Sequence, residues 1–86
     1  MNEQVEKIKA SLKNPNWKEI QALTDELHSM YDKNEWKIQL LGDEDEYESL
    51  NESINHLLVA VEEKEVKDAK EELATIKTFL GDIYSF

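Results

Sequence analysis

Residues 5–27 read VEKIKASLKNPNWKEIQALTDEL, and their apolar pattern returns forty-nine residues later in residues 54–76, which read INHLLVAVEEKEVKDAKEELATI. This repeated pattern decides the fold. In both stretches the apolar residues recur at helical spacing, with one five-residue step in the middle. They are Val5, Ile8, Leu12, Trp17, Ile20 and Leu27 in the first stretch, and Ile54, Leu57, Val61, Val66, Ala69 and Ile76 in the second.

The five-residue steps, from Leu12 to Trp17 and from Val61 to Val66, break the phase of the apolar stripe. At about 100° per residue, each step rotates the apolar face by roughly 140°. One straight helix cannot keep both segments on a single core face, so we expect a turn at each step. The pattern predicts an all-α fold in which four helices form two antiparallel hairpins packed into one small bundle over residues 1–86.

The first turn carries strong signals for a helix end. We expect a first helix over about residues 3–13, followed by Asn14-Pro15-Asn16. Two starts of the second helix are open. Either Asn14 is the cap and Pro15 occupies the first helical position, or Asn16 is the cap and Glu19 completes a capping box.

The second turn region predicts the end of one long helix and the start of another. The second helix is expected to end at Leu40 or Leu41, with Gly42 in the left-handed conformation after it. Asp43 and Glu46 have the spacing of a capping box that opens the third helix.

The last turn, Glu62-Glu63-Lys64-Glu65, contains neither Gly nor Pro. A continuous helix through this segment is therefore the main alternative, and only the phase break argues against it. If a turn lies here, we expect proline to be tolerated at Lys64 or Glu65. In a continuous helix it would cost about 3 kcal/mol.

The composition excludes several classes of function. Twenty carboxylates stand against ten basic residues, all lysine, for a formal net charge of −10. A nucleic-acid-binding protein needs a basic stripe, so direct nucleic-acid binding is disfavoured, as is attraction to an anionic membrane surface. There is no cysteine, which excludes disulfides and thiolate metal sites.

No constellation of residues indicates catalysis, a metal site or a cofactor. The acidic run Asp43 to Glu46, with Glu48, lacks the Gly of a calcium loop and fits a helix start favoured by the helix dipole. His28 and His56, the two histidines, are expected at the edge of the core rather than in a metal site. We therefore expect a protein that is not an enzyme and binds no cofactor.

Trp36 is a large apolar residue that does not belong to the apolar stripe of its helix. On a straight helix it points about 180° away from Leu27, with Leu40 one turn further on the same face. Trp36 and Leu40 are therefore the candidate partner-binding residues, although packing within the chain remains open. The main stripe of this helix is Trp17, Ile20, Leu27, Tyr31, Ile38 and Leu41.

The C-terminal end is rich in aromatic residues. We expect Phe79, Ile83, Tyr84 and Phe86 to close the bundle against Trp17 or Trp36, with a docking tail as the alternative.

These residues resemble a family of short, functionally uncharacterised proteins of Gram-positive bacteria. The resemblance rests on Asn16-Trp17-Lys18-Glu19, Leu27, Trp36, the acidic start at Asp43 to Glu46, then Ile54, Leu57, Leu58 and the segment Leu73 to Leu80. Such proteins carry an N-terminal hydrophobic segment before a helical domain of this size, and here that segment is missing. The resemblance implies an extracytoplasmic domain tethered to the membrane, and no catalytic residue.

We therefore expect a non-catalytic helical interaction module that binds a protein partner. The partner can also be a second copy of the chain, which would make a homodimer. Contact with the membrane would come only through the missing N-terminal anchor. The alternative is a small acidic cytoplasmic or phage inhibitor that mimics nucleic acid or binds a basic protein. It would apply if Met1 is the native start.

Overall fold

The computed structural model describes residues 1–41 and 44–84, with side chains up to residue 81. Four helices follow one another: α1 (Asn2–Ser11), α2 (Trp17–Leu41), α3 (Glu44–Glu62) and α4 (Val66–Tyr84). No strand occurs within these two ranges. The predicted all-α fold is confirmed. The first helix ends two residues earlier than expected.

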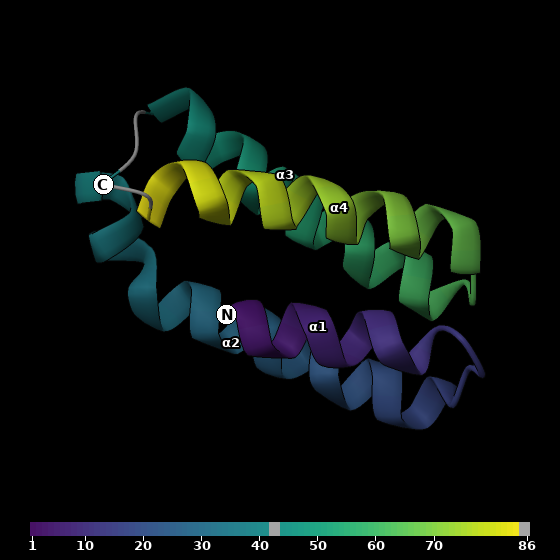
Figure 1. Cartoon of the computed structure of the whole chain (residues 1–86). Coiled ribbons are helices and arrows are strands. Elements are labelled where there is room, and N and C mark those ends of the chain that lie inside the picture. The colour runs from purple at the N-terminus through teal and green to yellow at the C-terminus, as the bar shows by residue number, and fades with distance from the viewer. Residues whose placement is uncertain (42–43, 85–86) are drawn as a thin grey trace.

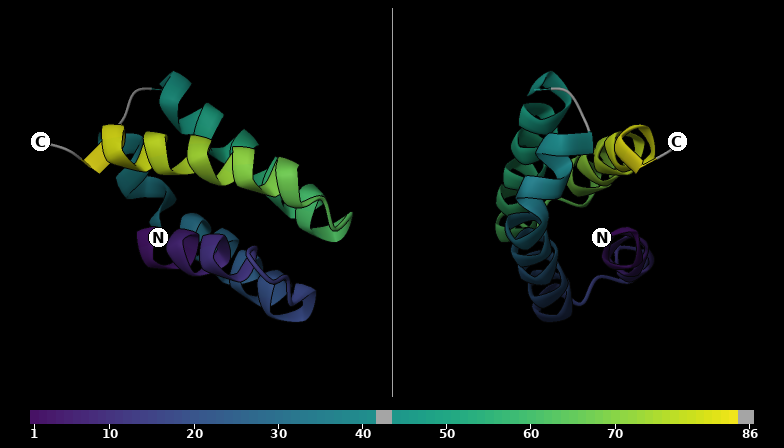
Figure 2. Two further views of the ribbon diagram at one scale, coloured as in Figure 1. Left: turned by 45° about the vertical axis from the view of Figure 1, so that its right-hand side comes forward. Right: turned by 90° about the vertical axis from the view of Figure 1, so that its left-hand side faces the viewer.

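The helices form two antiparallel hairpins, α1 with α2 and α3 with α4, which pack on each other (Figure 1). Seen along the bundle in the right panel of Figure 2, α1 and α4 lie on one side, and α2 and α3 on the other. The two hairpins differ in the length of their first helix. The first helix of one hairpin, α1, has 10 residues, and that of the other, α3, has 19. Because α2 has 25 residues, it extends well past the start of α1, and its C-terminal part has no α1 beside it.

The first residue of α2 follows from a cap at Asn16. The Asn16 side-chain oxygen accepts a hydrogen bond from the N–H of Glu19 at 3.3 Å, and its carbonyl accepts from the N–H of Ile20 at 2.9 Å. These bonds pair donors that a helix start otherwise leaves unsatisfied. Of the two predicted caps, the structure has Asn16. The expected roles of Gly42 and Asp43 fall on residues outside the described ranges.

The turn between α3 and α4 is present, so α3 and α4 are two helices. Lys64 has a φ of 58°, in the left-handed region. The N–H of Lys64 donates to the carbonyl of Val61 at 3.1 Å, and the N–H of Glu65 donates to that of Ala60 at 2.8 Å. This pair of bonds defines a Schellman motif.

Proline does not fit this turn, contrary to the expectation from a turn alone. Proline fixes φ near −65°, which is incompatible with the positive φ of Lys64, and it has no N–H to donate from either position 64 or 65.

One hydrophobic core lies between the hairpins, and the predicted stripes supply most of it. Trp17 and Val66, which begin α2 and α4, are only partly buried against this core. Leu41 was expected in the stripe but is 41% exposed, because it lies at the far end of α2. The buried residues are Val5, Ile8, Leu12, Ile20, Leu27, Tyr31, Ile38, Leu50, Ile54, Leu57, Ala60, Val61, Ala69, Leu73, Ile76 and Leu80.

Tyr31 is the one aromatic residue in this buried set. Its ring stacks on that of Tyr47 from α3, with centroids 6.0 Å apart and planes 24° apart. Its buried hydroxyl has no hydrogen-bond partner among the described residues. Burial, together with the neighbouring Tyr47 phenol, raises the pKa of Tyr31 far above its ordinary value.

Candidate functional site

The two candidate partner-binding residues are exposed together near the end of α2. Trp36 is 60% exposed and Leu40 is 76% exposed, and we call the surface that these two side chains form the Trp36 patch. Ile38, between them in sequence, is fully buried and faces the core. The Nζ of Lys37 lies 5.5 Å from the centroid of the Trp36 ring, within cation–π range.

The C-terminal aromatic residues are placed only in part. Phe79 is partly buried against the core, as is Trp17. Phe86 and the side chains of Ile83 and Tyr84 lie outside the description, so their predicted packing against Trp17 or Trp36 stays a prediction.

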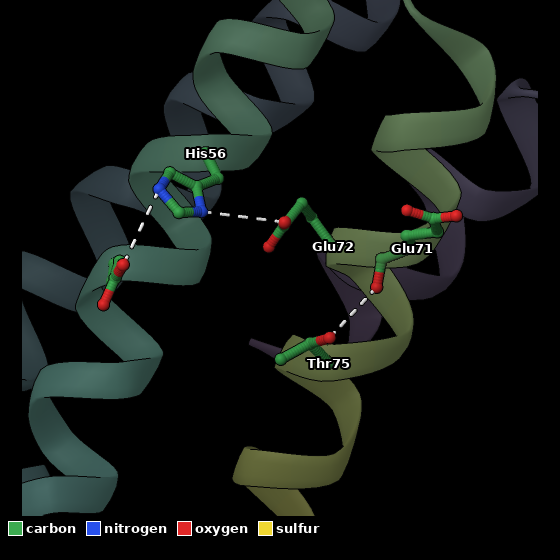
Figure 3. A network of polar contacts seen from close by, with 5 residues as sticks. His56, Glu71, Glu72 and Thr75 are labelled. Carbon is green, nitrogen blue, oxygen red and sulfur yellow. Dashed lines mark hydrogen bonds and ion pairs between the residues drawn. The ribbon is translucent and has the colours of Figure 1, made fainter.

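His56 bridges α3 and α4 on the surface (Figure 3). Its Nε2 lies 3.8 Å from Glu52 on its own helix, and its Nδ1 lies 3.7 Å from Glu72 on α4. On α4, the Thr75 hydroxyl donates to the carbonyl of Glu71 at 3.1 Å. The two contacts of His56 lie at the surface, where pairs at ion-pair distance contribute little to stability.

His28 is half-buried on α2, with its Nδ1 3.8 Å from Asp32 one turn further along. The two histidines are thus in separate settings, one on a single helix and one between α3 and α4. Within the described ranges, no three His, Asp or Glu side chains are grouped to hold a metal ion.

Carboxylates gather on the side of α4 that faces α3. We call this surface the acidic groove. On the α3 side it is lined by His56, by Val59, which is 55% exposed, and by Ala60. Its carboxylates are those of Glu63, Glu65, Asp68, Glu71 and Glu72.

The opposite side of α4 carries a cleft that sequence reasoning missed. This lysine cleft, of about 550 Å³, lies between α1 and α4. Its lining residues are Val5, Lys9 and Lys13 from α1 and the turn after it, and Lys70, Leu73, Ala74, Lys77 and Thr78 from α4. Four of the ten lysines of the chain line it, and no carboxylate does.

One ion pair connects the two helices that form the lysine cleft. The Nζ of Lys77 lies 2.7 Å from the carboxylate of Glu6 on α1. The hydrogen bond and charge of Lys77 hold the pKa of Glu6 below its usual value, and the charge of Lys9 adds to this effect. Lys13 and Lys70 have no ion-pair partner in the part of the chain that the structure describes.

The lysine cleft has only a weak sequence signal. Lys9 and Lys13 are one helical turn apart, and Lys70 and Lys77 are two turns apart, so each pair follows one helix edge. The two edges come together only because α1 packs beside α4, and the hairpin pattern does not specify that neighbour.

The described ranges contain no helix with both the length and the apolar character needed to cross a membrane. No curated protein and no solved structure matches the chain. One protein family does match, over residues 1–85, and it is described as a domain of unknown function (DUF4363). This match includes α1, which lies ahead of the residues that carried the resemblance. Because it spans all but the last residue, the chain belongs to the DUF4363 family.

Proposed function

We propose that this protein is a non-catalytic helical interaction module that contacts a protein partner through the Trp36 patch. One observation carries the proposal. Two large apolar side chains one turn apart, Trp36 and Leu40, are left 60% and 76% exposed on a helix whose opposite face is buried. Tryptophan is enriched at the energetic centres of interfaces, because burying its large ring contributes much binding free energy.

A second copy of the chain is the first partner to test. In a two-fold symmetric dimer the same patch lies on both sides of the contact, so the Trp36 patches of two copies would cover each other. The concentration dependence of the mass, measured by sedimentation equilibrium, tests this directly.

The test variant is Trp36→Ala, and the control is Val59→Ala, which removes an exposed apolar side chain from α3. Because Trp36 is exposed, we expect its replacement to change the free energy of unfolding by no more than about 0.5 kcal/mol and to abolish self-association. The Val59→Ala variant should still associate. A loss of about 3 kcal/mol of stability in Trp36→Ala would instead assign Trp36 to the fold, and the proposal would fail.

If the wild-type chain is monomeric, the partner is a different protein. Capture from the source cells should then be compared between the wild type and Trp36→Ala. A partner that both proteins retain equally would show that the Trp36 patch is not its binding site.

We also propose that the module is displayed outside a Gram-positive bacterial membrane, on a hydrophobic segment ahead of residue 1. The support is the resemblance to short proteins of that layout. Fractionation of the source cells with an antibody to this domain tests it. A band heavier than 10.1 kDa in the membrane fraction is the expected result. A 10.1 kDa band in the soluble fraction would contradict the tether.

The alternative, an acidic protein that binds a basic partner, is favoured by one observation, the five carboxylates around the acidic groove. Affinity for such a partner should fall steeply with salt, because exposed charges are screened. Asp68→Asn with Glu72→Gln should weaken it further. Binding that is insensitive to salt would exclude this alternative.

A further inference from the structure

The lysine cleft is formed where α1 and α4 pack with small residues between them. Val5 and Leu73 close the floor and are almost fully buried, while the small side chains of Ala74 and Thr78 leave room above them. The resulting volume of about 550 Å³ falls within the range of roughly 300–1,000 Å³ that is typical of ligand sites.

The walls of the cleft combine apolar and positive character. Lysine side chains present an aliphatic stem to the protein and an ammonium group to water. Four such side chains therefore give the cleft apolar walls beneath a positive rim. Glu6 pairs with Lys77, whereas Lys13 and Lys70 keep no ion pair in the described part of the chain. The rim thus has positive charge left for a ligand.

The distribution of these charges indicates the shape of the ligand. Lys9 and Lys13 stand on one wall, and Lys70 and Lys77 on the other. The separation of seven positions between Lys70 and Lys77 corresponds to about 10 Å along α4. A single phosphate or carboxylate headgroup reaches only one end of such a rim. A ligand that uses all of it carries several negative charges on both sides of an apolar strip.

We propose that the lysine cleft is a docking groove for an acidic amphipathic helix of a partner protein. The apolar stripe of that helix would lie over Ala74 and Thr78, and its flanking carboxylates would meet the lysines on the two walls. Amphipathic helices commonly dock into grooves in this way, with apolar anchors at helical spacing.

The rest of the molecule makes the site selective. The net charge of −10 includes these four lysines, so the remaining surface is more acidic still and repels an acidic ligand. Charge complementarity therefore directs such a helix to this cleft and away from the acidic groove on the other side of α4.

This docking groove is separate from the Trp36 patch. The residues that line the cleft belong to α1, the turn after it and residues 70–78 of α4, whereas the patch lies in the last turns of α2. The end of α2 lies at the opposite end of the bundle from the end of α1 and the start of α4 (Figure 1). The two proposals can therefore fail independently, and Trp36→Ala should leave binding in the cleft unchanged.

The test is an NMR titration of the isotope-labelled full chain. The probe is a synthetic helical peptide with leucines at positions i, i+3, i+4 and i+7 and glutamates on both flanks. The control peptide has glutamine in place of each glutamate. We expect saturable shift changes at Val5, Leu73, Ala74 and Thr78 with the glutamate peptide, and none that saturate with the glutamine peptide.

The matched variants separate the cleft from general charge. Lys13→Gln with Lys70→Gln should weaken binding about tenfold at low salt, because each lost pair has the strength of an exposed ion pair. Lys33→Gln with Lys37→Gln makes the same change in net charge on α2 and should have little effect. All four lysines are exposed, so these variants should fold, which circular dichroism checks.

Several results would overturn the proposal. They are the absence of saturable shifts, equal binding of both peptides, or shifts confined to α2. Binding of the chain to phosphatidylglycerol vesicles without any binding of the peptide would assign the lysines to a membrane surface and would also overturn it.

Discussion

Replacing Lys64 by glycine is expected to stabilise the protein, because Lys64 adopts a conformation that suits glycine better. Its φ of 58° places it at the left-handed position that follows α3. The Schellman bonds to Ala60 and Val61 hold it there. In a lysine, this conformation brings the Cβ close to the following carbonyl.

The magnitude follows from three terms. Removing the Cβ relieves roughly 1–2 kcal/mol of left-handed strain. Glycine is freer in the unfolded chain, which offsets about 0.5–1 kcal/mol of this gain. Loss of a positive charge at the C-terminal end of α3, where the helix dipole favours a cation, costs about 0.3 kcal/mol more. The free energy of unfolding should therefore rise by about 0.5 kcal/mol.

The charge term is removed by a control, Lys64→Gln, which loses the charge but keeps the Cβ. The glycine variant should exceed this control by about 0.75 kcal/mol, which corresponds to a midpoint roughly 3–6 °C higher for a domain of this size. A second control, Glu63→Gly, changes a residue without positive φ and should lose about 0.5–1 kcal/mol. Thermal unfolding followed by circular dichroism measures all three.

A Lys64→Gly variant that melts at or below Lys64→Gln would refute the reasoning. In that case Lys64 does not carry in solution the left-handed strain that glycine would relieve.

Three further predictions concern the cap, the core and the buried phenol. Asn16→Ala should cost about 1 kcal/mol through loss of the cap on α2, whereas Asn14→Ala should change little; urea unfolding compares them. Leu57→Ala should cost about 2–5 kcal/mol, since Leu57 is fully buried, against no more than about 0.5 for the exposed Leu40→Ala in the same assay. Tyr31→Phe should be neutral or stabilising by about 1 kcal/mol at neutral pH, because the buried hydroxyl has no partner. In the wild-type protein the pKa of Tyr31 is raised by folding, so only the unfolded chain releases this proton near pH 10. The free energy of unfolding of the wild type should therefore be constant in this respect below about pH 10 and should fall above it. Unfolding of Tyr31→Phe across that range should show a smaller fall, and an equal fall would contradict the assignment.

The architecture was predictable because its signal is periodic. The step from Val61 to Val66 specified a turn in a segment with neither glycine nor proline, and the structure has that turn. The pattern could not show how the turn is made. Glycine or asparagine usually marks a left-handed residue in a sequence, and a lysine there does not. The prediction that proline would be tolerated at Lys64 or Glu65 was wrong for this reason.

The candidate sites were predictable to different degrees. Trp36 and Leu40 share one helix face, so their common exposure follows from the periodicity of a single helix. The lysine cleft depends instead on which helices become neighbours. Lys9 and Lys77 approach the same carboxylate, that of Glu6, from the two ends of the sequence. Local spacing carries no information on such a long-range pairing.

The contact between the first and the last helix makes circular permutation of the chain feasible. Met1 and Leu80 line the same hollow, so the start of α1 lies beside the last turns of α4. A short linker across this gap would make the backbone a ring, and the ring can be opened at the turn between α3 and α4. A circular permutant that begins at Glu65 and ends at Lys64 would keep every helix intact. It would also release Lys64 from its left-handed conformation, which makes this turn a favourable place for new ends.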